Sequence, residues 1–270
     1  MKKLLLTVLI LVLGAALAAC GGKEKAGDDK TLTFGATAGP YSDMLKKAII
    51  PGLEEKGYKV TVTEFGDYIQ PNNALNDGNV DSNLFQHTVY LENFAKENNM
   101  ELSSLIVVPT APLGIYSKKF ESIDDIADGS TVTIPNDPVN AARALIVLEA
   151  NGLVEIDPNV EPLKASEKDI VKNPKNLVVT PIEAAQLPRS VESADVAAVP
   201  GNFALAASMN LTDALVLEDM PDQFRNVVAV KTENKDEQFA KDIIEVIESE
   251  QFEKVIDSDF QGFGKPAWMQ

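Results

Sequence analysis

Cysteine, histidine and tryptophan are nearly absent from this chain of 270 residues, which contains one of each. A single cysteine cannot form a disulfide within the chain. His87 is the only histidine, and no other histidine or cysteine is free to share a metal ion with it, so we expect no metal site and no cofactor. The phosphate-binding pattern Gly-x-x-x-x-Gly-Lys-Ser/Thr is missing as well. These absences argue against most enzyme classes, although catalysis by paired carboxylates stays open.

No apolar run reaches the length of about 20 residues that a membrane-spanning helix needs. The longest run is Leu4–Ala19, which follows the basic residues Lys2 and Lys3 and ends in small residues. A basic start, a short apolar stretch and a small-residue cleavage site are typical of a secretory signal peptide. We therefore predict that residues 1–19 are a signal peptide and that the mature chain is exported.

The lone cysteine, Cys20, directly follows the predicted signal peptide. The segment Leu17-Ala18-Ala19-Cys20 resembles the bacterial lipobox, in which the thiol is acylated and the chain is cut before the cysteine. Acyl chains gain about 0.8 kcal/mol per buried methylene, so several of them hold a protein on a membrane. Residues 20–30 are small and charged, which predicts a flexible tether before a folded part that begins near Thr31. The alternative is an ordinary signal peptide with an incidental cysteine. The predicted location is the extracytoplasmic face of the cell membrane.

Basic residues are few compared with acidic ones. The chain has 24 lysines and arginines against 41 acids, a formal charge of −17. Removal of residues 1–19 takes away two lysines and no acid, which leaves 22 basic and 41 acidic residues and a charge of −19. Such a balance argues against nucleic acid and anionic lipid surfaces as partners.

Strand-like and helix-like segments alternate along the mature chain, which indicates an α/β fold class. Helices are expected over 41–56, with a kink or break at Pro51, and over 88–97, 122–126 and 239–256, the last interrupted near Ser249. A further helix is expected to begin at Asp137-Pro138, with Asp137 as its N-cap and Pro138 in its first turn. Two segments, 78–94 and 193–209, share one plan: an acid near the strand start, an asparagine and a phenylalanine near its end, then a helix. This repeat predicts two similar lobes whose strand ends face a shared cleft.

Five motifs, in order along the chain, resemble the NlpA family of methionine-binding lipoproteins. They are Asp67–Asn72, Asn83–Leu91, Asn136–Leu145, Asn173–Leu177 and Ala185–Arg189. The resemblance implies a type II periplasmic-binding-protein fold, with two α/β lobes joined by crossings near 113–117 and 227–232. It gives lobe 1 as residues 31–113 and 228–270, and lobe 2 as residues 114–227.

The same resemblance implies a function: capture of L-methionine or a related small molecule for the permease and ATPase subunits of an ATP-driven importer. A methionine-containing dipeptide or another small amino acid is the alternative ligand. An enzyme on a similar fold and a surface lipoprotein used for adhesion are the alternative classes of protein.

The resemblance also implies which residues bind the ligand. Arg143 would bind its carboxylate, with Asn140 on the same helix face because it lies three residues earlier. Asn140 and Asn202 would bind the polar ends of an amino acid. The side-chain pocket would be formed by Tyr68, Phe85, His87 and Tyr90, whose rings suit a polarizable thioether.

From the residues alone, other interpretations remain open. Arg143 could be a surface arginine paired with one of the many acids. Asn202 follows Pro200-Gly201 and could serve only as a helix N-cap. Trp268, close to the chain end, is expected to pack the tail onto a lobe.

Overall fold

The computed structural model describes residues 30–270. The predicted signal peptide and the lipidation site Cys20 lie outside the described residues, as does all of the predicted tether except Lys30. Lys30 is the first residue of strand β1, so the folded part begins at the position expected from the sequence.

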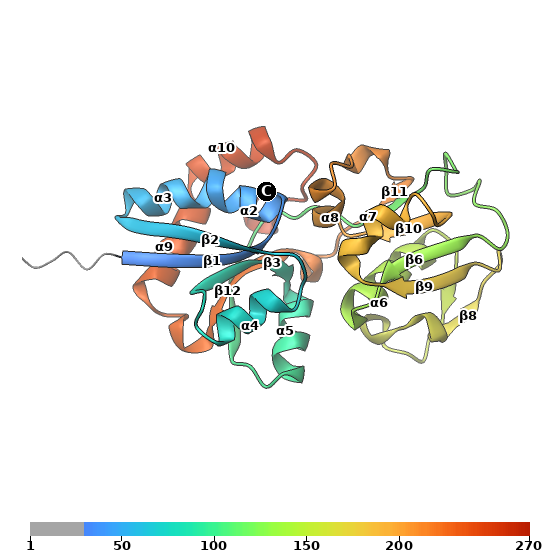
Figure 1. Cartoon of the computed structure of the whole chain (residues 1–270), viewed down its shortest axis with the longest axis horizontal. Helices are drawn as coiled ribbons and strands as arrows, with labels where there is room; N and C mark the ends of the chain where they lie inside the picture. Colours follow the sequence, from blue (N-terminus) through green and yellow to red (C-terminus); the bar gives the residue numbers. More distant parts are fainter. Residues whose placement is uncertain (1–29) are drawn as a thin grey trace, which may run out of the picture. The chain divides into compact units, whose positions relative to one another are not determined.

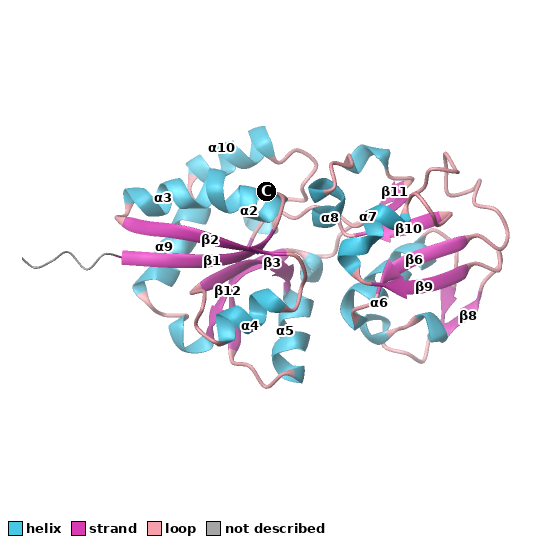
Figure 2. Cartoon of the chain, viewed as in Figure 1, coloured by secondary structure: helices cyan, strands magenta, loops and turns pink. Residues whose placement is uncertain are grey.

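Within residues 30–270 the strands form two five-stranded sheets and one two-stranded sheet, with helices packed against the larger sheets (Figures 1 and 2). The first sheet has the order β2-β1-β3-β12-β4, and the second has the order β11-β5-β10-β6-β9. We call the first sheet with its helices the first lobe, and the second sheet, together with the two-stranded sheet and their helices, the second lobe.

The strands of the first lobe are β1 (Lys30–Thr37), β2 (Tyr58–Phe65), β3 (Ser82–His87), β4 (Leu102–Val107) and β12 (Asn226–Lys231). Its helices are α2 (Pro40–Met44), α3 (Ile50–Glu55), α4 (Gln70–Asn76), α5 (Thr88–Glu97), α9 (Gln238–Ile247) and α10 (Glu250–Asp259). The strands of the second lobe are β5 (Gly114–Tyr116), β6 (Thr131–Pro135), β7 (Glu155–Ile156), β8 (Ile170–Lys172), β9 (Val178–Ile182), β10 (Val196–Val199) and β11 (Val216–Leu217). Its helices are α6 (Pro138–Ala150), α7 (Leu187–Ser190) and α8 (Gly201–Ala206).

Strand β12 of the first sheet is buried on both faces, and its side chains alternate between two layers of helices. Val228 packs into the cluster that includes α3, α9 and α10, whereas Val227 and Ala229 pack against α4 and α5. Figure 1 shows the matching arrangement, with α3 and α10 on one side of the sheet and α4 and α5 on the other. This covering explains why β12 reads as a continuous apolar run in the sequence.

The repeated plan predicted from the sequence corresponds to the same strand arrangement in both lobes. Strands β1 and β3 are parallel in the first lobe, and β6 and β10 are parallel in the second. Asp81, before β3, accepts the N–H of Thr33 at 2.7 Å, and Asp195, before β10, accepts the N–H of Thr131 at 2.7 Å. Each acid thus ties the start of its strand to the neighbouring parallel strand, and the prediction of two similar α/β lobes is confirmed.

The chain passes between the lobes twice, but not where the sequence suggested. The crossings run over residues 108–113 and 218–225, between β4 and β5 and between β11 and β12. The predicted crossings at 113–117 and 227–232 are instead occupied mainly by β5 and β12, whose apolar side chains are buried in the sheets. Pro109, Pro112 and Pro221 lie in the observed crossings, and a proline has no N–H to offer to a strand ladder.

The helix expected over 41–56, with a kink or break at Pro51, is interrupted by a wide π-helical turn, Leu45–Ile49, which ends two residues before Pro51. The wide turn accommodates the proline, which cannot donate to the preceding turn. The prediction of a helix over 122–126 is wrong. The segment forms turns instead, and the hydroxyl of Ser122 donates to Asp125 Oδ2 at 2.7 Å. The break near Ser249 is confirmed, since this residue caps α10.

The C-terminal tail packs on the first lobe. Trp268 Nε1 donates to the carbonyl of Val107 at 2.9 Å, while 40% of the residue stays exposed. The predicted packing of the tail is therefore confirmed. In the part of the chain that the structure describes, no helix combines the length and the apolar character needed to cross a membrane.

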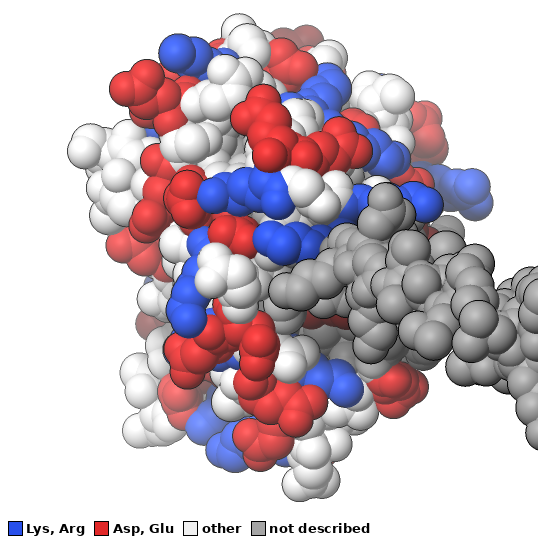
Figure 3. Space-filling view, turned by 90° about the vertical axis from the view of Figure 1, so that its left-hand side faces the viewer, with Lys and Arg blue, Asp and Glu red and all other residues white. Residues whose placement is uncertain are grey.

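Acidic and basic side chains are interspersed over the face shown in Figure 3. The ion pairs of the first lobe include Lys46–Glu64 at 2.6 Å and Lys47–Asp259 at 3.0 Å. Exposed pairs of this kind contribute little to stability because water and salt screen them. They do keep the surface polar despite the excess of acids.

Candidate functional site

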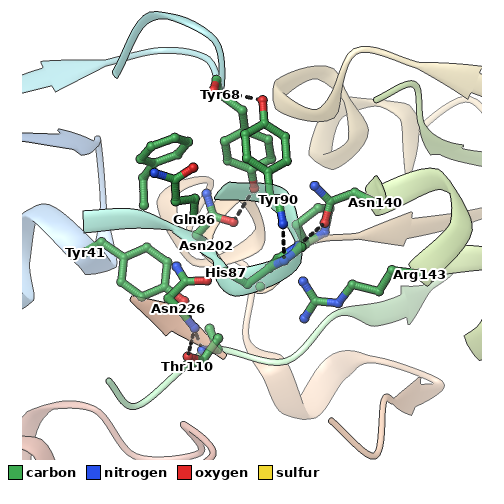
Figure 4. Close-up of a pocket in the computed structure, with 14 residues that line it drawn as sticks. Tyr41, Tyr68, Gln86, His87, Tyr90, Thr110, Asn140, Arg143, Asn202 and Asn226 are labelled. Atoms are coloured by element: carbon green, nitrogen blue, oxygen red, sulfur yellow. Dashed lines mark hydrogen bonds between the residues drawn. The ribbon is translucent and has the colours of Figure 1, made fainter. Parts of the chain in front are cut away.

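A pocket lies between the lobes, where β3 and α5 face α6 and α8 (Figure 4). The residues that line it are Tyr41, Tyr68, Phe85, Gln86, His87, Tyr90, Thr110, Ala111, Asn140, Arg143, Pro200, Gly201, Asn202 and Asn226. All seven residues predicted to bind a ligand are among them, so the fold brings these side chains to one place. Their contact with a ligand stays a prediction.

Arg143 is held in the pocket by a buried carboxylate. The side chain of Arg143 is 5% exposed and that of Glu218 is 3% exposed. Arg143 Nε donates to Glu218 Oε2 at 2.8 Å, and Arg143 Nη2 pairs with Glu218 Oε1. Burial by itself would lower the pKa of Arg143, but the charge and hydrogen bonds of Glu218 outweigh it and raise the pKa. The alternative of a surface arginine is therefore wrong.

His87 joins the two lobes through Asn140. It is the N-cap of α5, where its Nδ1 accepts the N–H of Tyr90 at 3.1 Å. Its Nε2 lies 3.2 Å from Asn140 Oδ1, and since Nδ1 is an acceptor, Nε2 carries the proton and donates. Burial, with a smaller contribution from the charge of Arg143, lowers the pKa of His87 to about 3. The ring is therefore neutral at physiological pH and is a fixed wall of the pocket.

Asn140 is oriented from two sides. Its Oδ1 accepts from His87, and its Nδ2 donates to Asp137 Oδ1 at 3.0 Å. Asp137 is also the N-cap of α6 and accepts the backbone N–H of Asn140 at 2.9 Å, as the Asp-Pro sequence predicted. Burial raises the pKa of Asp137. These bonds leave Asn140 with less freedom to rearrange toward a ligand than Asn202.

Asn202 forms the second bridge between the lobes. Its Oδ1 accepts a hydrogen bond of 2.6 Å from the hydroxyl of Tyr68. Its Nδ2 is buried and has no hydrogen-bond partner among the described residues. The N-cap of α8 is Pro200 and not Asn202, so the alternative of a capping role is wrong. A buried donor without a partner is costly unless something else accepts from it.

Aromatic rings form the wall of the pocket on the first-lobe side. The ring centroid of Tyr68 lies 6.0 Å from that of Phe85 and 5.9 Å from that of Tyr90. Phe203 of the second lobe reaches the ring of Tyr68 at 4.9 Å. The hydroxyl of Tyr90 donates to the carbonyl of Tyr68 at 2.9 Å, which keeps polar atoms away from this apolar wall.

Sequence reasoning missed Glu218 and Asn226. Glu218 is one of 41 acids, and nothing local marks it as the partner of an arginine 75 residues earlier. Asn226 is fixed by its backbone, whose N–H donates to Thr110 Oγ1 at 2.7 Å and whose carbonyl accepts from Val108 at 2.8 Å. Its buried side chain faces the pocket (Figure 4). The available signal was a polar residue at the start of an apolar strand.

Metal-ligating residues do not gather in the described part of the chain. Among residues 30–270, no group of three or more histidines, cysteines or acids lies close enough to hold a metal ion. The chemistry of the pocket is that of hydrogen bonding, one buried ion pair and aromatic contact.

Two α/β lobes, joined by two crossings and enclosing a polar and aromatic pocket, define the fold of solute-binding proteins. The chain belongs to the NlpA lipoprotein family, whose family model matches residues 32–268.

Curated relatives match along nearly the full length. The methionine-binding lipoprotein MetQ of Bacillus subtilis is 36% identical over 268 residues, 97% of each chain. The D-methionine-binding lipoprotein MetQ of Salmonella typhi is 34% identical over 261 residues, 96% of this chain and 95% of the relative. A nutrient binding protein from Burkholderia cenocepacia, solved bound to methionine, has a TM-score of 0.82 and 35% identity, over 86% of this chain and 97% of its own.

Proposed function

We propose that this chain is a lipid-anchored solute-binding protein that captures methionine between its lobes for delivery to an ATP-driven importer. The observation that carries the proposal is the pocket itself, which combines a buried guanidinium, an unpartnered amide donor and an aromatic wall. The named binding partners of its relatives, methionine and D-methionine, agree with that chemistry.

The carboxylate of the ligand is assigned to Arg143 and Asn202. Arg143 uses Nε and Nη2 for Glu218, which leaves Nη1 for a ligand. Asn202 Nδ2 supplies a second donor that has no described partner. Two donors that converge on one carboxylate match its two oxygens. The side-chain oxygen of Asn226, which faces the same pocket, is the acceptor we assign to the ammonium group.

The side chain of the ligand is assigned to the aromatic wall. Tyr68, Phe85 and Tyr90 surround one side of the pocket with ring edges and faces. A thioether gains about 0.3–1.5 kcal/mol per contact with an aromatic ring, so methionine should bind somewhat more tightly than leucine. His87 is neutral and adds no charge to repel or attract this end of the ligand.

Calorimetric titration of the purified mature domain with each amino acid tests the ligand assignment. Methionine should bind most tightly, ahead of leucine by a modest factor and ahead of glutamate by a large one, since a second carboxylate has no partner in the aromatic wall. Mass spectrometry of gently purified protein should also reveal methionine carried through purification. If leucine, glutamate or a methionine-containing dipeptide bound more tightly than methionine, the assignment of methionine as the ligand would be wrong.

Closure of the two lobes on the ligand is part of the proposal. Two crossings of a few residues each permit a hinge, and residues from both lobes line the pocket. Ligand should shift the population toward a compact form and raise the melting temperature. Small-angle scattering with and without methionine measures the change, and glutamate, which is expected to bind far more weakly, is the control at the same concentration. An unchanged radius of gyration on saturation would exclude the hinge.

Export and delivery to an importer are proposed on the basis of the family and of the sequence before residue 30. Acylation of Cys20 would keep the protein at the extracytoplasmic face of the membrane, beside the permease to which it delivers. The chain is proposed to bind rather than to catalyse, because its pocket residues are committed to holding each other and the ligand. Turnover of methionine by the purified protein would contradict this.

A further inference from the structure

Glu218 holds together three segments that are far apart in the sequence. It is the first residue of the second crossing, directly after β11. Its Oε1 accepts the N–H of Leu113, the last residue of the first crossing, at 2.7 Å, and its own N–H donates to the carbonyl of Leu113 at 2.9 Å. The same carboxylate binds Arg143 on α6. One buried side chain therefore links both crossings to the arginine of the pocket.

This arrangement fixes the orientation of the guanidinium. The carboxylate occupies the edge formed by Nε and Nη2. The ring of Phe224 covers a face of the group, with its centroid 5.0 Å from Cζ of Arg143. Glu218 and Phe224 therefore leave Nη1 as the donor that can turn toward the pocket. A planar fork held on one edge and one face has lost most of its rotational freedom before any ligand arrives.

The arrangement also balances the charge of the pocket. Arg143 and Glu218 form a buried pair whose net charge is zero, and a second buried acid, Asp137, lies nearby. A ligand with a carboxylate and an ammonium adds no net charge to this site. An analogue without the ammonium adds a negative charge beside two carboxylates, which costs more in a buried place than in water.

We infer that Glu218 is a positioning residue that holds Arg143 for the ligand carboxylate and, by balancing its charge, makes the pocket select zwitterionic amino acids over anionic analogues. The inference rests on the proposed function and deepens it, because it assigns the selectivity for ligand charge to one residue outside the pocket lining. Specificity of this kind comes from an element that repels the wrong ligand.

Calorimetric titration of four proteins with two ligands tests the inference. The ligands are methionine and its α-keto acid analogue, which keeps the carboxylate and the thioether but lacks the ammonium. The proteins are the wild-type mature domain, Glu218→Gln, Glu218→Asp and Asp219→Asn. The last is the matched control, because it removes the same charge one residue away from an exposed side chain.

The measured quantity is the ratio of the dissociation constants for the analogue and for methionine. The wild-type protein should prefer methionine by about 100-fold or more, and Asp219→Asn should keep that ratio. Glu218→Gln should weaken the binding of methionine, while the affinity for the analogue should stay the same or rise. The ratio of the two dissociation constants should therefore fall by about tenfold. Glu218→Asp keeps the charge and should keep the ratio, even where both affinities fall.

If Glu218→Gln weakened the binding of methionine and of the analogue by the same factor, the inference would be overturned and Glu218 would be a purely structural residue. A wild-type protein that binds both ligands equally would also overturn it. Wild-type protein that binds no methionine would instead overturn the proposed function, which is a separate outcome. A thermal melting curve will show whether Glu218→Gln folds. If it does not, Glu218→Asp still tests the role of the charge, because a lower ratio of dissociation constants in this variant, which keeps the charge, would refute that role.

Discussion

The hydroxyl of Tyr68 donates a hydrogen bond of 2.6 Å to Oδ1 of Asn202, across 134 residues of sequence and between the two lobes. A second bond between the lobes, from His87 to Asn140, lies in the same pocket. The residues proposed to surround the ligand are therefore also the residues that join the lobes. A change at one of them should alter closure and binding together.

Tyr68→Phe removes the first of these bonds and keeps the ring. Asn202 Oδ1 then lacks its partner in the closed form, whereas water can satisfy it in an open form. We expect methionine to bind more weakly by about 1–2 kcal/mol, roughly a 5- to 30-fold rise in Kd. Calorimetric titration measures this change.

Tyr58→Phe is the matched control for Tyr68→Phe. The hydroxyl of Tyr58 donates to Asp242 at 2.6 Å within the first lobe, away from the pocket. Its loss should lower the melting temperature and leave Kd for methionine unchanged. Equal effects of the two substitutions on Kd would show that the Tyr68 bond has no special part in binding.

Much of the fold could be predicted from local patterns. Alternating strands and helices, the Asp137-Pro138 helix start and the Ser249 break are set by nearby residues, and the structure has each of them. The predicted crossing at 227–232 was wrong because a short apolar segment that passes between lobes and a central strand such as β12 have the same sequence pattern. Only pairing with β3 and β4, which lie more than 100 residues earlier, makes 226–231 a central strand.

The candidate site divides in the same way. The seven predicted residues came from motifs, and the fold collects them in one pocket. Glu218 was not predicted because its role depends on contacts with Arg143 and Leu113, which are far from it in the sequence and close to it only in the folded chain. A partner chosen by tertiary structure from 41 acids has no local signature.

The Arg143–Glu218 pair should show strong coupling in stability. Arg143→Met or Glu218→Gln alone leaves a buried charge without its partner, a loss of about 3–5 kcal/mol. The double variant Arg143→Met/Glu218→Gln removes both charges, so it should be more stable than the sum of the single effects predicts, by at least about 2 kcal/mol. It should still bind methionine orders of magnitude more weakly than wild type, because the carboxylate has lost its cation.

Urea unfolding of the wild type, both single variants and the double variant measures this coupling. Asp222 and Arg225 supply a control pair, since their ion pair of 2.9 Å includes an acid that is 79% exposed. A double-mutant cycle of Asp222 and Arg225 should show a coupling free energy of less than about 1 kcal/mol. Additive losses in the Arg143–Glu218 cycle would indicate that water reaches the pair and that burial does not set its energy.

Cys20→Ala tests the predicted lipid anchor. The substitution removes the thiol that would carry the acyl chains and leaves residues 31–270 unchanged. The folded domain should melt at the wild-type temperature and bind methionine normally, but it should no longer fractionate with membranes after signal cleavage. Ser193→Ala, a change of similar size within the folded domain, should leave membrane fractionation intact. Continued membrane association of cleaved Cys20→Ala protein would refute the anchor.

The neutral state of His87 should make the protein less stable as the pH falls. Burial lowers its folded-state pKa to about 3, while an unfolded chain has a histidine pKa of about 6.5. Between these values the unfolded state binds one more proton than the folded state. The free energy of unfolding should therefore decrease by up to about 1.4 kcal/mol per pH unit as the pH falls from 6.5 toward 3. Above pH 6.5 this residue should contribute no pH dependence.

His87→Asn isolates this effect, because asparagine is a good N-cap and can accept from Tyr90 without binding a proton. Urea unfolding of wild type and variant between pH 4.5 and 7.5 should give curves that run parallel above pH 6.5 and converge below it, by about 2 kcal/mol at pH 5. Asp137, whose pKa is raised by burial, acts with the opposite sign, but it is present in both proteins and cancels in the comparison. Curves that stay parallel down to pH 4.5 would mean that His87 takes up a proton in the folded protein, which would break its bond to the Tyr90 N–H and open the pocket wall.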